Sequence, residues 1–69
     1  MDVRKVVGAN VRRFRQAKGL TQEQFADKSG YSQQYLSDLE RGLRNPTIVT
    51  IYELADALDI SHVELVRPK

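Results

Sequence analysis

Glycine residues divide the sequence at short, regular intervals, and this spacing restricts the chain to short helices joined by tight turns. Gly19, Gly30 and Gly42 follow one another at intervals of 11 and 12 residues. Glycine commonly ends a helix because it adopts the left-handed conformation without steric cost. The segments between the glycines contain no alternation of apolar and polar residues, which a half-buried strand would need. The sequence therefore predicts helices and no strands.

Capping residues open the segments that follow these glycines. Thr21 and Gln24 have the spacing of a capping box, in which a hydroxyl accepts from the backbone N–H three residues later and the glutamine side chain returns to the cap. Ser61 and Glu64 repeat this spacing. The two remaining segments are preceded by the single capping residues Ser32 and Thr47. The predicted helices cover residues 2–18, 22–29, 33–41, 48–58 and 62–66.

Apolar residues at helical spacing define the expected core. In the first segment the stripe consists of Val3, Val7, Val11 and Phe14. In the last two segments it consists of Ile48, Ile51, Leu54, Ala55, Leu58, Ile60 and Leu65. A second apolar set lies off this stripe and is a candidate dimer surface, although isolated exposed apolar residues are also common: Val49, Tyr52, Val63 and Val66.

Length and composition exclude several classes of function. The 69 residues have room for one domain, which we place at residues 1–69. The chain has no cysteine and one histidine, His62, which we expect to be exposed, so neither a metal site nor a cofactor is predicted. No catalytic Ser/His/Asp or Cys/His set is available, and we expect no enzyme. No apolar run approaches the ~20 residues of a membrane span, and no secretory segment follows Met1, so we expect a cytoplasmic protein.

Charge is distributed unevenly along the chain. The net charge is only +2, but residues 1–20 contain six basic residues and one acidic residue. Residues 47–66 contain four acidic residues and no lysine or arginine. Such a distribution is compatible with ordinary solvated charge, or with a basic surface that binds an anionic partner such as nucleic acid.

The second and third predicted helices have the pattern of a helix-turn-helix. Ala26 is small enough to lie inside the corner between the two helices, and Gly30 allows the backbone to turn four residues later. Ser29 departs from the pattern, because an apolar residue usually packs at this position. The shared core is expected from Phe25, Tyr31, Leu36 and Leu39.

Four segments of the sequence resemble the lambda-repressor-like, Xre/Cro-type helix-turn-helix regulators: Gly19–Ala26, Gly30–Ser32, Leu39–Gly42 and Arg44–Thr47. The resemblance extends from about Val7 to Leu65. It implies a compact all-α domain of five helices, with the helix-turn-helix at about residues 21–41. It also implies a transcription regulator of a prokaryote or phage that binds double-stranded DNA, usually as a homodimer, and so associates with the nucleoid.

The third helix is the candidate reader of DNA bases. If Leu36 and Leu39 face the core, the polar side chains lie on the opposite face. Paired glutamines in the first turn suit adenine, because an amide presents a donor and an acceptor together. An acidic residue on this face is tolerable near phosphates only if it accepts from cytosine or orients a neighbour. The candidate base-reading residues are Gln33, Gln34, Ser37 and Asp38, and the alternative is a solvated helix face.

Phosphate contacts are expected around this reading helix. Gln22 begins the second helix, where free backbone N–H groups favour an anion. The resemblance implies a phosphate contact for Gln22 and places the loop with Arg44 and Asn45 against the DNA backbone. Arg41 suits a base or a phosphate. Tyr35 flanks the reading face, and its alternative role is partial packing in the core.

The resemblance assigns Arg15 and Glu40 to an ion pair that joins the first and third helices, and we therefore predict a structural role for both. The leading function is sequence-specific binding of a palindromic operator by a homodimeric regulator. A controller protein of a restriction–modification system is an alternative, with Glu23 and Asp27 contacting RNA polymerase unless they are merely solvated. A protein-interaction module, such as an antitoxin-like partner, is another.

Overall fold

The computed structural model describes residues 1–68, which form five helices. They are α1 (Val3–Ala17), α2 (Gln22–Ser29), α3 (Gln33–Glu40), α4 (Ile48–Ala57) and α5 (His62–Val66). No strand occurs in this part of the chain, and the predicted all-α fold is confirmed. Over the same residues, no helix combines the length and the apolar character that crossing a membrane requires.

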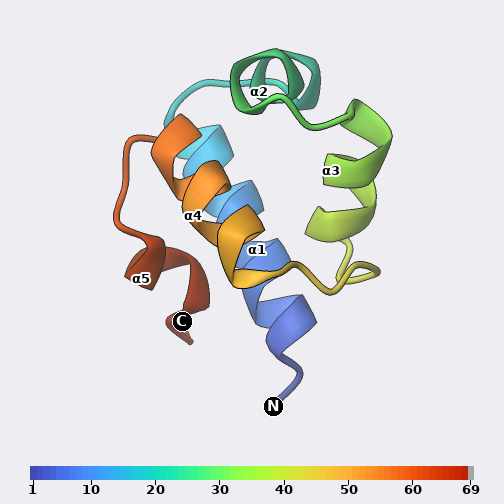
Figure 1. Ribbon diagram of the computed structural model, residues 1–69, viewed down its shortest axis with the longest axis vertical. Coiled ribbons are helices and arrows are strands. Elements are labelled where there is room, and N and C mark those ends of the chain that lie inside the picture. Colours follow the sequence, from blue (N-terminus) through green and yellow to red (C-terminus); the bar gives the residue numbers. More distant parts are fainter. Residues whose placement is uncertain (69) are drawn as a thin grey trace.

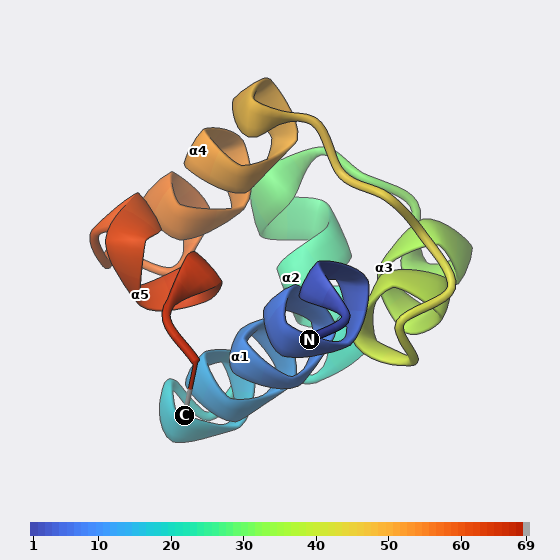
Figure 2. The same ribbon diagram turned by 90° about the horizontal axis from the view of Figure 1, so that it is seen from below.

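The longest helix, α1, lies at the centre of the arrangement. It packs against α3 on one side and against α5 on the other, and α4 packs against α2 and α5 (Figure 1). Seen along α1 from below, α3 and α5 stand on opposite sides of it (Figure 2). The helix-turn-helix pair α2–α3 is therefore held at one side of the molecule, and the α4–α5 pair occupies the other.

Four of the five predicted helix starts agree with the structure, and the first is one residue early, because Asp2 is the N-cap of α1. Thr21 and Gln24 form the expected capping box, with both reciprocal hydrogen bonds present. Ser61 also caps its helix, but its hydroxyl accepts from the backbone N–H of Val63, so the second capping box predicted with Glu64 is wrong. The Glu64 carboxylate instead lies 3.4 Å from a guanidinium nitrogen of Arg67, one turn later.

The core joins apolar residues from all five helices. The buried members are Val7, Val11, Phe25, Leu36, Leu39, Leu54, Ala55, Ala57, Leu58 and Leu65. The predictions for Val3 and Ile48 are wrong, because these side chains are 58% and 74% exposed. Each is the first residue of its helix, one turn before the covered part of the apolar stripe begins.

Helices α1 and α3 approach each other more closely than the sequence analysis anticipates. Gly8 is buried in α1, and a Cβ atom added there would collide with the backbone carbonyl oxygen of Leu39 and lie 3.0 Å from that of Glu40. Side chains normally separate packed helices by 8–10 Å between axes. The missing side chain of Gly8 thus brings the end of α3 onto α1, beside Arg15.

Candidate nucleic-acid interface

The turn between α2 and α3 sets the direction of the candidate reading helix. Gly30 has a φ of +82°, a left-handed conformation that costs glycine little, and its N–H donates to the carbonyl of Ala26 over 2.9 Å. Ser32 then caps α3 by accepting from the N–H of Tyr35 over 3.0 Å. Ser29, the residue that departs from the family pattern, accepts from the N–H of Tyr31 over 3.3 Å. Its hydroxyl therefore satisfies a backbone group in the turn.

The polar face of α3 lies opposite its buried side. Leu36 and Leu39 are completely covered. Gln33 and Gln34 are exposed in the first turn, while Ser37 and Asp38 are partly buried one turn further on. The structure therefore places the four candidate base-reading residues along one helix whose other side is fixed in the core.

Three candidate contact residues follow this face towards the loop before α4. The guanidinium of Arg44 lies 5.3 Å from the ring centre of Tyr35 in a cation–π contact. Tyr35 in turn stacks on Tyr31, with 5.1 Å between ring centres. Partial core packing of Tyr35, the alternative role, is therefore present, and its contact with phosphate stays a prediction. Asn45 is exposed in the same loop.

The predicted ion pair between Arg15 and Glu40 is present. The Arg15 Nε and Nη2 atoms donate to the two carboxylate oxygens of Glu40 over 2.7 and 3.0 Å, and Nη1 donates to the carbonyl of Leu20 over 2.7 Å. Only 11% and 4% of the two side chains are exposed. This bidentate pair fixes α1 to the end of α3, where charge-assisted hydrogen bonds are strong.

The amide of Gln22 joins this ion pair. Its Nε2 atom donates to the Glu40 Oε1 atom over 3.2 Å. A polar hollow of about 240 Å³ lies over the network, lined by Arg12, Arg15, Gln22, Ser37, Glu40 and Arg41. Two predicted phosphate contacts, Gln22 and Arg41, thus lie at one depression. Arg12 joins them, although the sequence analysis assigns it no contact; its position one turn before Arg15 was the available signal.

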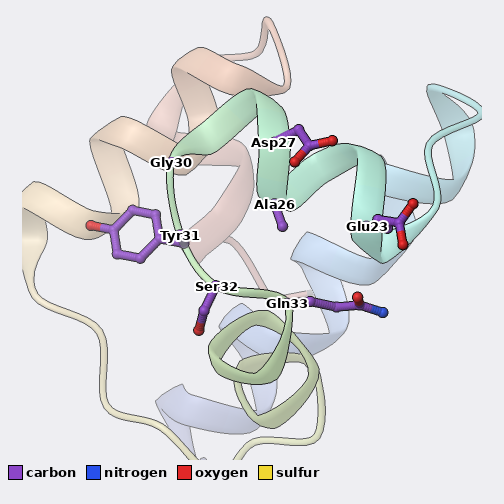
Figure 3. Close-up of a pocket in the computed structure, with 7 residues that line it drawn as sticks. All are labelled: Glu23, Ala26, Asp27, Gly30, Tyr31, Ser32 and Gln33. Atoms are coloured by element: carbon purple, nitrogen blue, oxygen red, sulfur yellow. The ribbon is translucent and has the colours of Figure 1, made fainter.

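A second hollow, of about 570 Å³, lies in the corner between α2 and the start of α3, and Ala26 lines it (Figure 3). Glu23 and Asp27 project from α2 at its edge, and Gln33 extends from the start of α3 (Figure 3). Both carboxylates are exposed. The two acidic residues are therefore accessible next to a residue proposed to read DNA.

Tyr31 fastens the turn to α4 through an interaction that the sequence did not reveal. Its hydroxyl donates to the carboxylate of Glu53 over 2.6 Å and lies 3.0 Å from the Thr50 hydroxyl. The hydrogen bond to the Glu53 carboxylate, together with partial burial, raises the pKa of Tyr31 above its ordinary value of 10.0, and the Thr50 contact opposes this shift. The helix-turn-helix is thus attached to the helix behind it.

Helices α4 and α5 leave several large apolar side chains exposed. Five large apolar side chains on α4 and α5 are exposed: Ile48, Val49, Tyr52, Val63 and Val66. We call these residues the α4–α5 surface. The expectation that His62 is exposed needs correction, because its ring is partly buried and stacks on Tyr52 with 4.0 Å between ring centres.

Comparison with known proteins agrees with this geometry. The profile of the helix-turn-helix family HTH_3 matches residues 11–65. The HTH-type transcriptional regulator y4dJ of Sinorhizobium fredii is 66% identical over 68 residues, which cover 99% of this chain and 88% of that protein. The crystal structure of the restriction–modification controller protein C.AhdI of Aeromonas hydrophila has a TM-score of 0.86 at 45% identity, covering 90% of this chain and 94% of the other.

A further similar structure is that of SinR, a master regulator for biofilm formation, in complex with DNA. It has a TM-score of 0.83 at 32% identity and covers 88% of this chain and 98% of the other. The fold and the matching sequences define a transcriptional regulator with a DNA-binding helix-turn-helix. The chain belongs to the helix-turn-helix family, among the lambda-repressor-like, Xre/Cro-type regulators, and its relatives are regulators rather than enzymes.

Proposed function

We propose that the protein binds a specific double-stranded DNA operator and regulates transcription from it, with α3 in the major groove. The observation that carries this proposal is the pair Gln33 and Gln34, both exposed in the first turn of a helix whose other side is completely buried. A side chain reads a base only when its backbone is held in place, and residues at the start of a recognition helix reach base edges. Residues 1–69 act as one domain, in the cytoplasm and on the nucleoid of a prokaryote or phage host.

The base contacts and phosphate contacts divide between two groups of residues. Base reading is assigned to Gln33, Gln34, Ser37 and Asp38 on α3. Phosphate contacts are assigned to Gln22, Tyr35, Arg41, Arg44 and Asn45. The hollow over the buried ion pair supports the second group, because Arg12 and Arg41 place positive charge beside the amide of Gln22. Phosphate contacts fix the register of the protein, while base contacts specify the sequence.

A homodimer is the proposed binding form. The α4–α5 surface supports it, because five exposed apolar residues on two packed helices are suited to burial against the same helices of a second copy. Helix α5, which contributes Val63 and Val66, lies on the opposite side of α1 from α3 (Figure 2). A two-fold dimer would read two half-sites of a palindrome about one helical turn, ~34 Å, apart.

A controller-type activator and repressor is the second candidate. It is favoured by the similarity to C.AhdI and by the exposed carboxylates of Glu23 and Asp27 at the edge of the hollow between α2 and α3. In this role the two acidic residues contact a basic surface of RNA polymerase bound next to the operator. A protein-interaction module on the same fold is the remaining alternative, and it has no need for Gln34 to distinguish bases.

Selection of bound duplexes from a random pool, followed by footprinting, tests the proposal. We expect one enriched palindrome with protection on both half-sites. Single-base variants of that operator are then measured with wild type, Gln34→Ala and Arg44→Ala. Gln34→Ala should lose about 1–3 kcal/mol at one position per half-site, whereas Arg44→Ala should weaken all duplexes alike and lower the salt slope by about one unit per subunit. Equal weakening of every variant by Gln34→Ala contradicts base reading by α3.

A further inference from the structure

Asp38 is an acidic residue on the helix face proposed to meet DNA, and both of its carboxylate oxygens are engaged by neighbours. Its Oδ1 atom accepts from the Gln34 Nε2 atom over 3.0 Å. Its Oδ2 atom lies 3.7 Å from the Nε atom of Arg44. The side chain is only 20% exposed. The carboxylate therefore lies between a proposed base reader and a proposed phosphate contact.

The hydrogen bond to Asp38 fixes which way the amide of Gln34 points. An ionised carboxylate only accepts hydrogen bonds, so the NH₂ group of Gln34, and not its carbonyl oxygen, has to face Asp38. The amide then keeps one N–H and its carbonyl oxygen for another partner. A glutamine without such a partner can rotate its amide by half a turn and present these two groups in the reverse order.

We propose that Asp38 is a positioning residue that determines sequence specificity by holding Gln34 in the orientation that selects adenine. In the major groove adenine presents the N6 amino group as a donor and N7 as an acceptor. The free carbonyl oxygen of Gln34 accepts from N6, and its remaining N–H donates to N7. This inference rests on the proposed function, and it assigns Asp38 to Gln34 rather than to a base of its own.

The charge of Asp38 supports a role in selection rather than in affinity. A carboxylate close to DNA phosphates opposes binding to every sequence. Arg44 offsets part of this repulsion, and its place over the Tyr35 ring keeps its guanidinium near Asp38. A group that weakens all complexes but directs one base reader increases the difference between the correct and the incorrect sequence.

The test uses operator duplexes with each of the four bases at the position where Gln34→Ala loses discrimination. Binding is measured for wild type, Asp38→Ala and Asp38→Asn, and for Asp56→Asn as a control that removes one exposed negative charge from α4. We expect adenine to be preferred by wild type, and Asp38→Ala to reduce that preference at least about fivefold, the lower end of a bidentate base contact. Asp38→Asn, which preserves the shape, should also reduce it, because asparagine accepts either orientation of Gln34.

Asp38→Ala should at the same time bind an unrelated duplex more tightly, whereas Asp56→Asn should leave the base preference unchanged. In a Gln34→Ala background, Asp38→Ala should cause no further loss of preference. The inference is overturned if wild type prefers another base at this position, if Asp38→Ala retains the adenine preference, or if its loss persists without Gln34. If Gln34→Ala itself shows no position-specific loss, base reading by α3 fails, and the role of Asp38 fails with it.

Discussion

The contact between α1 and α3 and the surface formed by α4 and α5 reverse the usual distribution of polar and apolar groups. In the first region a charged pair, Arg15 with Glu40, is buried. Nearby, Gly8 has no side chain, so the backbones of α1 and α3 lie in contact. The second region leaves large apolar side chains such as Ile48 and Val49 in solvent. Charged side chains, which usually face solvent, are buried in the first region, and apolar side chains, which are usually buried, face solvent in the second.

The two regions differ because the first has to fix the position of α3 relative to α1. A buried ion pair is weak evidence for stability, because desolvation of the two charges offsets much of their attraction. Its geometry is specific, however, and here it fixes the end of α3 and the amide of Gln22. On the α4–α5 surface, by contrast, the Ile48 and Val49 side chains lie mostly in solvent. We infer that the first region sets the geometry for DNA and the second associates with another protein surface.

The largest expected effect is the dependence of DNA affinity on salt, which should be strong, whereas self-association through the α4–α5 surface should depend on salt only weakly. A dimer that makes six to ten phosphate contacts should lose ~10³–10⁵ in DNA affinity between 50 and 200 mM salt. Self-association through the apolar α4–α5 surface should change little over the same range. Titration of DNA binding and sedimentation of the free protein measure the two responses. A flat response of DNA binding to salt contradicts a phosphate-contacting surface.

Substitution of Gly8 breaks the α1–α3 contact at the backbone. Alanine is favoured over glycine in a helix by about 1 kcal/mol. The added Cβ atom would nevertheless collide with the carbonyl of Leu39. We expect Gly8→Ala to lower the free energy of unfolding by about 1–2 kcal/mol, because an overpacking cost of up to about 3 kcal/mol exceeds what helix propensity provides. Denaturant unfolding measures the change, and the exposed neighbour Ala9, changed to glycine, gives the propensity effect alone. A stabilised Gly8→Ala protein would show that the two helices separate easily.

Removal of Glu40 breaks the ion pair in the same region. Glu40→Ala leaves the buried guanidinium of Arg15 with the Leu20 carbonyl as its remaining described acceptor. We expect a loss of about 1–3 kcal/mol in the free energy of unfolding. The double variant with Arg15→Ala should cost less than the sum of the single changes. Glu64→Ala, which breaks an exposed pair with Arg67, is the control and should cost less than ~1 kcal/mol. Absence of coupling in the Arg15–Glu40 cycle contradicts the pair.

The alkaline stability of the fold depends on Tyr31. The pKa of Tyr31 in the folded protein is raised above 10.0. The contribution of Tyr31 to the free energy of unfolding is therefore fully present below pH 10 and is lost as the pH rises through the pKa of the folded state. Tyr31→Phe removes the hydrogen bonds to Glu53 and Thr50 and should cost about 1 kcal/mol at neutral pH. The variant should also lose less stability than wild type above pH 10. Identical slopes for the two proteins in that range would exclude Tyr31 as the titrating group.

The smallest effect on folding is expected at the α4–α5 surface. Ile48→Ser and Val49→Ser alter exposed side chains, so unfolding of the dilute monomer should change by less than ~0.5 kcal/mol. Self-association should weaken in both variants, because the apolar area available for a second copy is reduced. Analytical ultracentrifugation over a concentration series measures this loss. Unchanged association in both variants would place the dimer contact elsewhere.

The local features of this fold were predictable from the sequence. Caps such as Thr21 and turns such as Gly30 involve residues that are neighbours in the chain, so their spacing identifies them. The face of α3 followed from the positions of Leu36 and Leu39. The Arg15–Glu40 pair, 25 residues apart, came from the family resemblance and not from spacing.

Interactions between distant segments were not predictable in the same way. The hydrogen bond from Tyr31 to Glu53 joins residues 22 positions apart, and neither residue type signals the other. The contact of Arg44 with Asp38 depends on the path of a loop. Helical spacing also predicted that Ile48 is buried, although the structure leaves it exposed. Periodicity identifies the apolar face of a helix but does not indicate where neighbouring helices stop covering that face.

Asn10 in α1 links the opening of the first helix to that of the last. Its buried amide nitrogen donates to the carbonyls of Leu65 and Arg67, 55 and 57 residues away. Five residues are too few for a helix to persist in water without tertiary contacts. The final helix therefore depends on its contacts with α1 and α4. Amide protons in α1 and α5 should exchange with solvent through a common opening, so that the chain unravels as one cooperative unit instead of fraying from its last helix.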